Sequence, residues 1–241
     1  GRMTAPLCIA GSIALNELSK RGIEVYSHVK AIAGVKDEGY FDNAPLSSEF
    51  QAKLSAVKTK EFPVVDDSCG EQMKSKIEQA RMDQDSVGGI IETVVYGMPA
   101  GIGGPIFGGI EAKIATLLYA IPAVKGVEFG NGYEVAELKG SENNDSFVMQ
   151  DGEVTMETNH SGGILGGISV GGSVAPIVVN CAIKPTPSIS KEQKTVDISK
   201  KENTVISIHG RHDPCIVPRA VPVTEAAVAL ALYDMILAQE A

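Results

Sequence analysis

The feature that most restricts how this chain can fold is an apolar segment close to its end, residues 222–238 (PVTEAAVALALYDMILA). Its composition and length predict a helix, with Pro222 in the first turn, where a proline is tolerated. The part AAVALALYDMIL is apolar on more than one side, so this helix needs neighbours on both faces. A layer of helices between two sheets would supply that cover.

The rest of the chain mixes helices and strands without a strict strand–helix–strand alternation. This favours the α+β class, with a layer of α-helices sandwiched between antiparallel β-sheets. Apolar spacing and a charged run predict helices at 5–21, 66–86 and 110–121, and residues 46–59 are a polar stretch that tolerates a helix. β-Branched runs predict strands at 23–35 and 87–99, two strands within 123–138 and one within 162–189, whereas 140–159 are expected to be polar and mobile. With 241 residues, 44% of them hydrophobic, the chain can bury a large core, and we expect one domain over 1–241.

Composition excludes some classes of partner. The net charge is −9, aromatic residues make up 5% of the chain and Trp is absent, so neither a nucleic acid nor an anionic membrane is an expected partner. A small anion is still possible, because a few cations can dominate a cleft. The four cysteines are widely spaced, without a CxxC pair, which favours a reducing, cytoplasmic location. We expect neither a signal peptide nor a membrane span.

A polar cluster follows the β-rich run 205–208. Two imidazoles, a guanidinium and a carboxylate (His209, Arg211, His212 and Asp213) lie within five residues, just before Pro214 and Cys215. The stiff segments on both sides suggest that this loop positions its charged side chains around a ligand.

A second polar segment, KPTPSI (184–189), combines one cation with two hydroxyls. Its prolines fix φ and remove backbone donors, so Lys184, Thr186 and Ser188 suit a phosphate or another anion. Taken alone, an exposed Pro-rich turn is about as good an interpretation.

Other motifs carry less weight. GISVG (167–171) matches a serine nucleophile elbow, and Asp197 and His209 or His212 follow it in a plausible order. An elbow needs a helix directly after the serine, and the glycines and proline after Ser169 disfavour a helix there. AGIGGPIFGG (100–109) lacks the Lys of a phosphate-binding loop, and close packing of helix on sheet is the simpler reading. The histidines have no metal-ligand spacing, so no metal is expected.

Several blocks taken together resemble one family. GRHDPC with RAVPVTEA, KPTPSI, NHSGGILGGIS, AVKGVEFG, GSENND and the opening GRMTAPLCIAG are similar to chorismate synthase, in the family's order and over nearly the whole chain. The resemblance implies a homotetramer that uses reduced FMN to eliminate phosphate from 5-enolpyruvylshikimate 3-phosphate, giving chorismate for aromatic amino-acid biosynthesis. It also implies a helical layer between two antiparallel sheets. Whether the flavin is reduced through a nicotinamide cofactor such as NADP is left open.

The resemblance also implies roles for individual residues. Asp213 would accept a proton near the flavin, and Arg211 would contact both flavin and substrate, while Arg2 would lie at the substrate pocket. The implied flavin-binding residues are Pro122, Ala123, Gly166, Lys184, Pro185, Thr186, Pro187 and Ser188.

The match departs from the family in two ways. It begins partway along the family's length, so we expect a chain truncated at its N-terminus, without the two histidines proposed as proton donors. An alternative is therefore a catalytically inactive fragment that keeps assembly and anion-binding surfaces. Asn180 stands where an Arg is common, which leaves the local geometry open.

Overall fold

The computed structural model describes residues 2–42, 48–150, 152–172, 174–210 and 212–240. At its centre lies a five-stranded antiparallel sheet with the order β2-β1-β3-β9-β4. Its strands are β1 (Glu24–Ile32), β2 (Val35–Lys36), β3 (Gly89–Tyr96), β4 (Val124–Phe129) and β9 (Ile177–Ile183). The predicted α+β class with antiparallel strands is confirmed.

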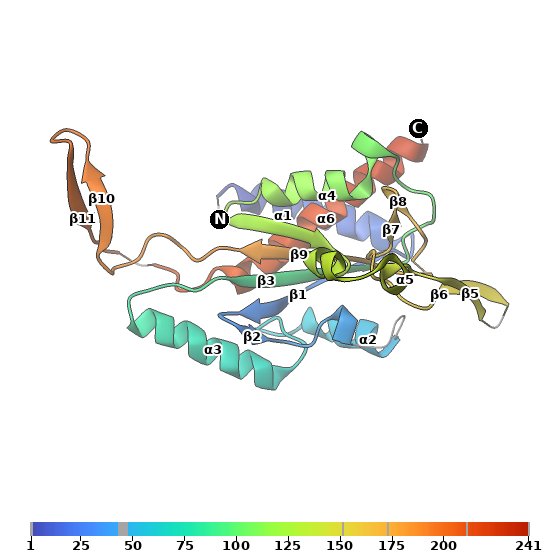
Figure 1. Ribbon diagram of the computed structural model, residues 1–241, viewed down its shortest axis with the longest axis horizontal. Coiled ribbons are helices and arrows are strands. Elements are labelled where there is room, and N and C mark those ends of the chain that lie inside the picture. The colour runs from blue at the N-terminus through green and yellow to red at the C-terminus, as the bar shows by residue number, and fades with distance from the viewer. Residues whose placement is uncertain (1, 43–47, 151, 173, 211, 241) are drawn as a thin grey trace.

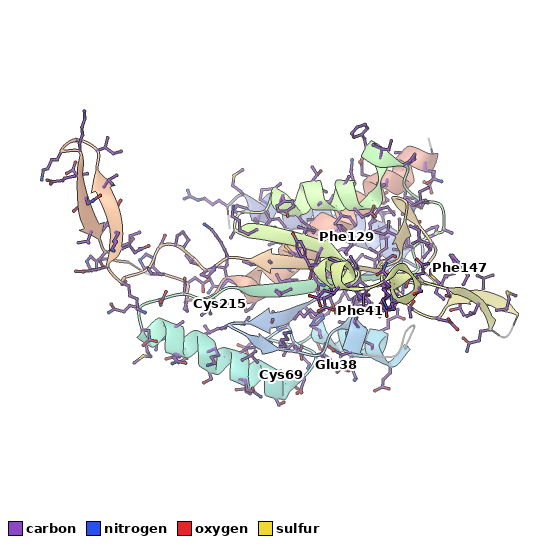
Figure 2. The ribbon with its side chains drawn as sticks, viewed as in Figure 1. Glu38, Phe41, Cys69, Phe129, Phe147 and Cys215 are labelled. Atoms are coloured by element: carbon purple, nitrogen blue, oxygen red, sulfur yellow. The ribbon has the colours of Figure 1, made fainter. Side chains whose placement is uncertain are left out.

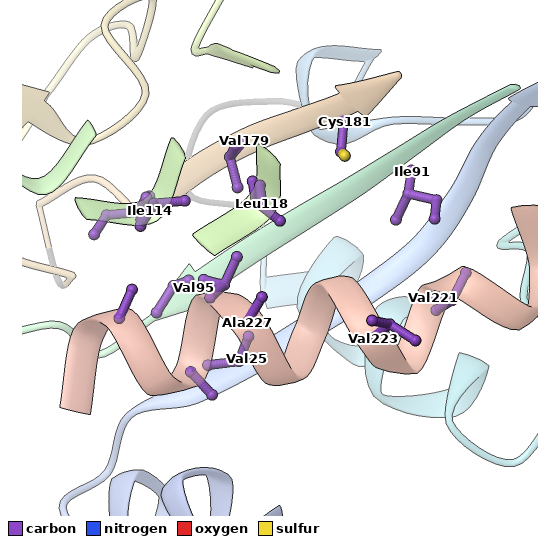
Figure 3. Close-up of a cluster of buried hydrophobic side chains, with 14 of the residues drawn as sticks. Val25, Ile91, Val95, Ile114, Leu118, Val179, Cys181, Val221, Val223 and Ala227 are labelled. Carbon is purple, nitrogen blue, oxygen red and sulfur yellow. The ribbon is translucent and has the colours of Figure 1, made fainter. Parts of the chain in front are cut away.

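A layer of three helices covers one face of this sheet (Figure 1). They are α1 (Thr4–Ser19), α4 (Ile110–Tyr119) and α6 (Val217–Glu240). The core between the helices and the sheet is aliphatic, and α6 crosses the sheet with Val221, Val223 and Ala227 directed into it (Figure 3). Among the described residues the layer meets only this one large sheet, and Ile9 and Ile13 on α1 are exposed.

The helix α6 occupies the position that its composition requires. The helix has 24 residues, and an 18-residue window within it has a mean hydropathy of 1.6, so by length and composition it could cross a membrane. In the fold, however, 56% of that window is buried. The prediction for its first turn was wrong, because the helix begins at Val217 and Pro222 lies inside it. Pro218 takes the early position that was assigned to Pro222, since a proline there interrupts no helical hydrogen bond.

The helices α1 and α6 pack backbone to backbone at one point. A Cβ on Gly11 would lie 2.3 Å from the Cβ of Ala226, which leaves room for glycine alone. We expect Gly11→Ala to destabilise the chain by about 1–3 kcal/mol through overpacking, although alanine is the better helix former. Urea denaturation measures this, with Gly140→Ala as the control, because nothing lies within 4 Å of a Cβ there. Equal stability of the two variants would mean that the helices can separate without cost.

The opposite face of the sheet carries a second, aromatic cluster. Tyr26, Tyr40 and Phe50 pack there with Leu54, Val94 and Val178. The helix α2 (Ser48–Val57) and the short helix η1 (Tyr40–Asp42) contribute to this cluster, whereas α3 (Asp67–Met82) buries Met73 in the aliphatic core. The N-terminus of α3 is capped by Asp66, which accepts a hydrogen bond from the Ser68 N–H at 2.7 Å.

Two predicted segments differ from the structure. Residues 123–138 form one strand, β4, followed by the 3₁₀ helix η3 (Gly132–Glu137), because Gly130 and Gly132 both take positive φ and turn the chain out of the sheet. Residues 140–159, expected to be polar and mobile, contain α5 (Gly140–Asn143) and a hairpin of β5 (Phe147–Gln150) and β6 (Glu153–Met156).

The remaining elements lie outside the main sheet. They are η2 (Ile106–Gly108), the hairpin of β7 (Ile164–Leu165) and β8 (Ile168–Ser169), and the hairpin of β10 (Gln193–Asp197) and β11 (Glu202–Ile206). The β10–β11 hairpin projects away from the body of the molecule (Figure 1).

Candidate functional site

The segment KPTPSI begins where β9 leaves the sheet. The Lys184 N–H donates to the Ala123 carbonyl at 2.9 Å, which ties the turn to the start of β4. Further along, the Ser86 hydroxyl donates to the Thr186 carbonyl at 2.6 Å. Gly88 allows this approach, because a Cβ there would lie 2.3 Å from a β9 carbonyl oxygen. The turn is thus fixed by its two neighbouring strands.

This turn presents polar groups that have no partner. The Thr186 hydroxyl oxygen is buried and makes no hydrogen bond among the described residues. The exposed Lys184 ammonium has no ion pair within the same described ranges. A buried hydroxyl without a partner costs free energy. A hydroxyl and a free cation on a rigid turn together suit an anionic group such as a phosphate.

Asp213 lies on the loop before α6. Its carboxylate accepts a hydrogen bond from the Cys215 N–H at 3.3 Å and pairs with Arg219 at 2.9 Å. The same carboxylate lines a cavity of about 580 Å³, with Lys74 and Arg219 beside it. Asp213 is therefore held by its own loop and faces open space.

The neighbouring side chains of this loop are also engaged. Nε2 of His212 is 2.8 Å from the Ile208 carbonyl, to which it donates as the protonated nitrogen. Burial raises the pKa of the Cys215 thiol to about 11, so this cysteine is not a thiolate at neutral pH. Figure 2 places Cys215 at the start of α6, toward the side from which the β10–β11 hairpin extends.

The segment before β3 brings the two polar segments together. Ser86 holds the Thr186 carbonyl, and the next residue, Val87, donates its N–H to the Pro214 carbonyl at 2.8 Å. The sequence analysis missed the roles of Ser86 and Val87. The Gly-Gly pair at 88–89, which lets other backbone approach closely, was the signal that could have revealed them.

The other predicted site residues are distributed as follows. Pro122 is exposed, and Ala123 takes a φ of 79°, a left-handed conformation that costs a non-glycine residue about 1–2 kcal/mol. Arg2 is exposed and lies just before α1 in the chain. Arg211 lies outside the described residues.

Gly166 does not join this group within the chain. It lies in the β7–β8 turn, and Gly163 beside this hairpin packs against the Pro176 carbonyl at the start of β9. Lys184 follows the other end of that strand, whose seven residues span about 23 Å. The two positions therefore lie at opposite ends of β9.

The serine-hydrolase interpretation fails on geometry. Ser169 is buried, and its hydroxyl donates to the Pro99 carbonyl at 2.5 Å and accepts from the Ile102 N–H at 3.0 Å. No helix follows it directly, and Asp197 is on the projecting hairpin. Ser169 is a structural turn residue.

A buried ionic cluster lies on the sheet face away from α6. The Glu92 carboxylate contacts Nε2 of His28 at 3.1 Å and the Lys30 ammonium at 2.6 Å, and accepts the Tyr40 N–H at 2.7 Å. Nδ1 of His28 lies 3.6 Å from the Asp37 carboxylate. His28 is thus a buried strand residue whose Nε2 is bonded to Glu92, whereas its Nδ1 has no hydrogen-bond partner among the described residues.

The protonation of this cluster follows from these contacts. Burial alone would lower the pKa of His28, but the Asp37 and Glu92 carboxylates outweigh burial and raise it. For Glu92 the directions are reversed. Burial alone would raise its pKa, but the charges of His28 and Lys30 outweigh burial and hold the pKa of Glu92 well below its usual range. The structure therefore favours a charged histidine between two carboxylates.

Comparison with known proteins gives one consistent result. The sequence model of the family described as chorismate synthase matches residues 1–237. Proteins named chorismate synthase from Lancefieldella parvula and Methanosarcina acetivorans are each 45% identical, over 97% and 98% of this chain. The one from Archaeoglobus fulgidus is 47% identical over 99% of the chain.

A solved structure agrees with these relatives. The chain superposes on a structure titled "Crystal Structure of Chorismate Synthase" with a TM-score of 0.79 and 27% identity, over 98% of this chain and 63% of that one. The chain spans about 62% of the length of the first two relatives.

Proposed function

The chain belongs to the chorismate synthase family, and we propose that it forms the part of such an enzyme that holds the flavin and accepts the substrate proton. The reaction eliminates phosphate from 5-enolpyruvylshikimate 3-phosphate, with loss of the C6 hydrogen, to give chorismate. The enzyme is then a carbon–oxygen lyase of the shikimate pathway that acts on a phosphate ester.

The unpartnered groups of the KPTPSI turn carry this proposal. The buried Thr186 hydroxyl and the unpaired Lys184 are matched to a bound anion, and FMN has a phosphate and an electron-rich reduced ring that such groups can hold. Pro185, Pro187 and Ser188 would complete the turn around the cofactor, with Pro122 and Ala123 on the adjoining backbone. When bound, reduced FMN supplies electron density that assists loss of phosphate and is recovered afterwards, without net redox change.

Asp213 is the residue proposed to take the proton. Its carboxylate is fixed by the Cys215 N–H and by Arg219, and it faces a cavity, so it can be positioned without rearrangement. Arg211, two residues earlier, would contact the flavin and the substrate through its planar guanidinium. Arg2 would add a further cation for the substrate.

The assembly proposed for the enzyme is a homotetramer in the cytoplasm. If Gly166 contacts flavin, as the family resemblance implies, it cannot share one flavin with Lys184 of the same chain across the length of β9. The Gly166 that contacts this flavin would then come from a second copy of the chain. Whether NADP reduces the flavin is a separate property, for which the geometry of this chain carries no argument.

The decisive experiment measures phosphate release. Under anaerobic conditions with chemically reduced FMN, the enzyme is expected to release phosphate from 5-enolpyruvylshikimate 3-phosphate and to form chorismate in equal amount. Phosphate release that is equally fast without flavin would refute the assignment. Tight flavin binding without phosphate release would identify the 241-residue chain as the inactive fragment considered above.

Lys184→Ala is expected to weaken binding of FMN. Loss of one charge-assisted hydrogen bond costs about 1.5–3 kcal/mol, which corresponds to roughly 10- to 150-fold in Kd. Fluorescence titration with FMN measures this. The control is Lys194→Ala on the β10–β11 hairpin, where an exposed lysine is also lost. Unchanged affinity in Lys184→Ala would make the turn structural only.

A further inference from the structure

A row of polar side chains crosses the sheet on the face away from α6. Register pairs His28 of β1 with Glu92 of β3, Glu92 with Asn180 of β9, and Asn180 with Glu128 of β4. Cross-strand partners share a face, so these four side chains are neighbours. The first two are ion-paired within the buried ionic cluster, whereas the last two form no ion pair among the described residues.

Asn180 is the unsatisfied centre of the row. Its side chain is 95% buried, at 5% exposure, and its amide oxygen makes no hydrogen bond among the described residues. It lines a cavity of about 600 Å³ between the sheet, η1 and η3. A buried amide oxygen without a donor is destabilising, so its position beside a cavity indicates a missing donor.

Glu128 brings a negative charge to the same cavity. Its carboxylate lies where a Cβ on Gly132 would stand, 2.2 Å away, so the glycine turn at the start of η3 makes room for it. Its one hydrogen bond among the described residues is a long one, 3.4 Å from the Tyr133 N–H. Glu134, also on the cavity wall, has no side-chain partner in the described part of the chain.

Three of the other charged groups around the cavity are already paired with a charged partner. Asp37 faces His28, Glu38 binds Lys53 at 2.9 Å, and Lys30 binds Glu92. Besides these, Asp42 accepts the Gly39 N–H, and Lys36 is exposed at the rim. Lys36 forms no ion pair among the described residues and offsets one negative charge, so the net charge left by Lys36, Asp42, Glu128 and Glu134 is still negative.

The ligand that fits is an organic cation with several donors. No three acidic, histidine or cysteine side chains among the described residues converge as metal ligands, which argues against a metal ion. A guanidinium group has five N–H donors in one plane, is weakly hydrated and stacks on aromatic rings. Phe41 lines this cavity and already has the Lys30 ammonium 6.0 Å from its ring centre, on the face of the sheet shown in Figure 2.

We infer that this cavity is a guanidinium site, in which Asn180 accepts a hydrogen bond from the group and Glu128 neutralises its charge. The site is separate from the proposed flavin turn and does not depend on the proposed reaction. The guanidinium comes either from a free small molecule or from an arginine side chain of a second copy. Both sources require the same two residues.

Butylguanidine is the probe for the free-ligand source, and the neutral butylurea is its matched control. Calorimetric titration of the 241-residue chain at low salt is expected to show one butylguanidine site and no heat from butylurea. Asn180→Leu removes the acceptor at similar size, and Glu128→Gln removes the charge. Each is expected to weaken binding by at least about tenfold, since a hydrogen bond to a charged group contributes that much.

Glu153→Gln on β6 is the control variant, because that glutamate is exposed and lies outside the cavity. Circular dichroism melts of all three variants separate loss of binding from loss of fold. If a second copy supplies the guanidinium, sedimentation velocity will show an associated species that both cavity variants dissociate and that butylguanidine, but not butylurea, competes away. Equal behaviour of the two probes, or binding and association unchanged in both cavity variants, would overturn the inference.

Discussion

Asp213→Asn is expected to slow phosphate release by about 10²- to 10⁴-fold, while FMN affinity and folding stay nearly unchanged. The asparagine oxygen can still accept the Cys215 N–H, so the loop keeps its hydrogen bond. The change removes the ion pair with Arg219, whose side chain is 80% exposed, and such pairs contribute about 0–1 kcal/mol. An amide cannot accept the proton that the proposed reaction releases.

The matched control for this variant is Asp234→Asn. Asp234 also forms a single ion pair on the surface, with Lys113 at 2.6 Å, and lies toward the C-terminal end of α6, whereas Asp213 precedes the start of that helix. Turnover at saturating reduced FMN should be normal in Asp234→Asn and nearly lost in Asp213→Asn. If both variants turn over normally, Asp213 only caps its loop, and the base is a different residue.

Glu92→Gln is expected to destabilise the chain by about 3–5 kcal/mol, the usual cost of removing one partner from a buried ion pair. The amide is nearly the same size, so the effect is electrostatic: Lys30 loses its carboxylate and His28 keeps only Asp37. Urea denaturation measures the loss. Glu153→Gln, at the exposed first position of β6, should cost less than about 0.5 kcal/mol.

The pH dependence of stability tests the same cluster. Glu92 has a lowered pKa, so its contribution is present above its ordinary value of 4.5 and declines as the pH falls below it. His28 has a raised pKa, so its contribution is complete below 6.5 and declines as the pH rises through the raised value. The stability that Glu92→Gln loses should therefore be largest between these two values. A difference that is constant from acid to alkaline pH would show that the cluster is not ionised as described.

The regular elements were largely predictable from the sequence, because the side chains that face the core repeat with the period of the element. Segment 110–121 has the helical period and forms α4, and 87–99 has β-branched density and contains β3. The prediction for residues 140–159 was wrong because the hairpin there has exposed apolar side chains, such as Phe147 and Val154, among polar neighbours. Periodicity gives little signal where no core face exists.

The candidate site was predictable as two separate segments, and their connection was not. KPTPSI and the Asp213 loop stand out because they combine charged groups with prolines. Ser86 and Val87 bind both segments through backbone atoms, and a backbone hydrogen bond leaves little mark on residue type. The vacant acceptor of Asn180 likewise depends on which strands lie beside β9, and no local pattern encodes that.

The contact between α1 and α6 has a consequence for how the protein is made. The Cys8 thiol and the Pro222 carbonyl that meet there are 214 positions apart. At about 5–20 residues per second, a ribosome needs roughly 10–40 s to pass from one to the other. During that time the apolar side of α1 has no α6 to cover it, so a chaperone that binds exposed aliphatic segments would have its longest opportunity there.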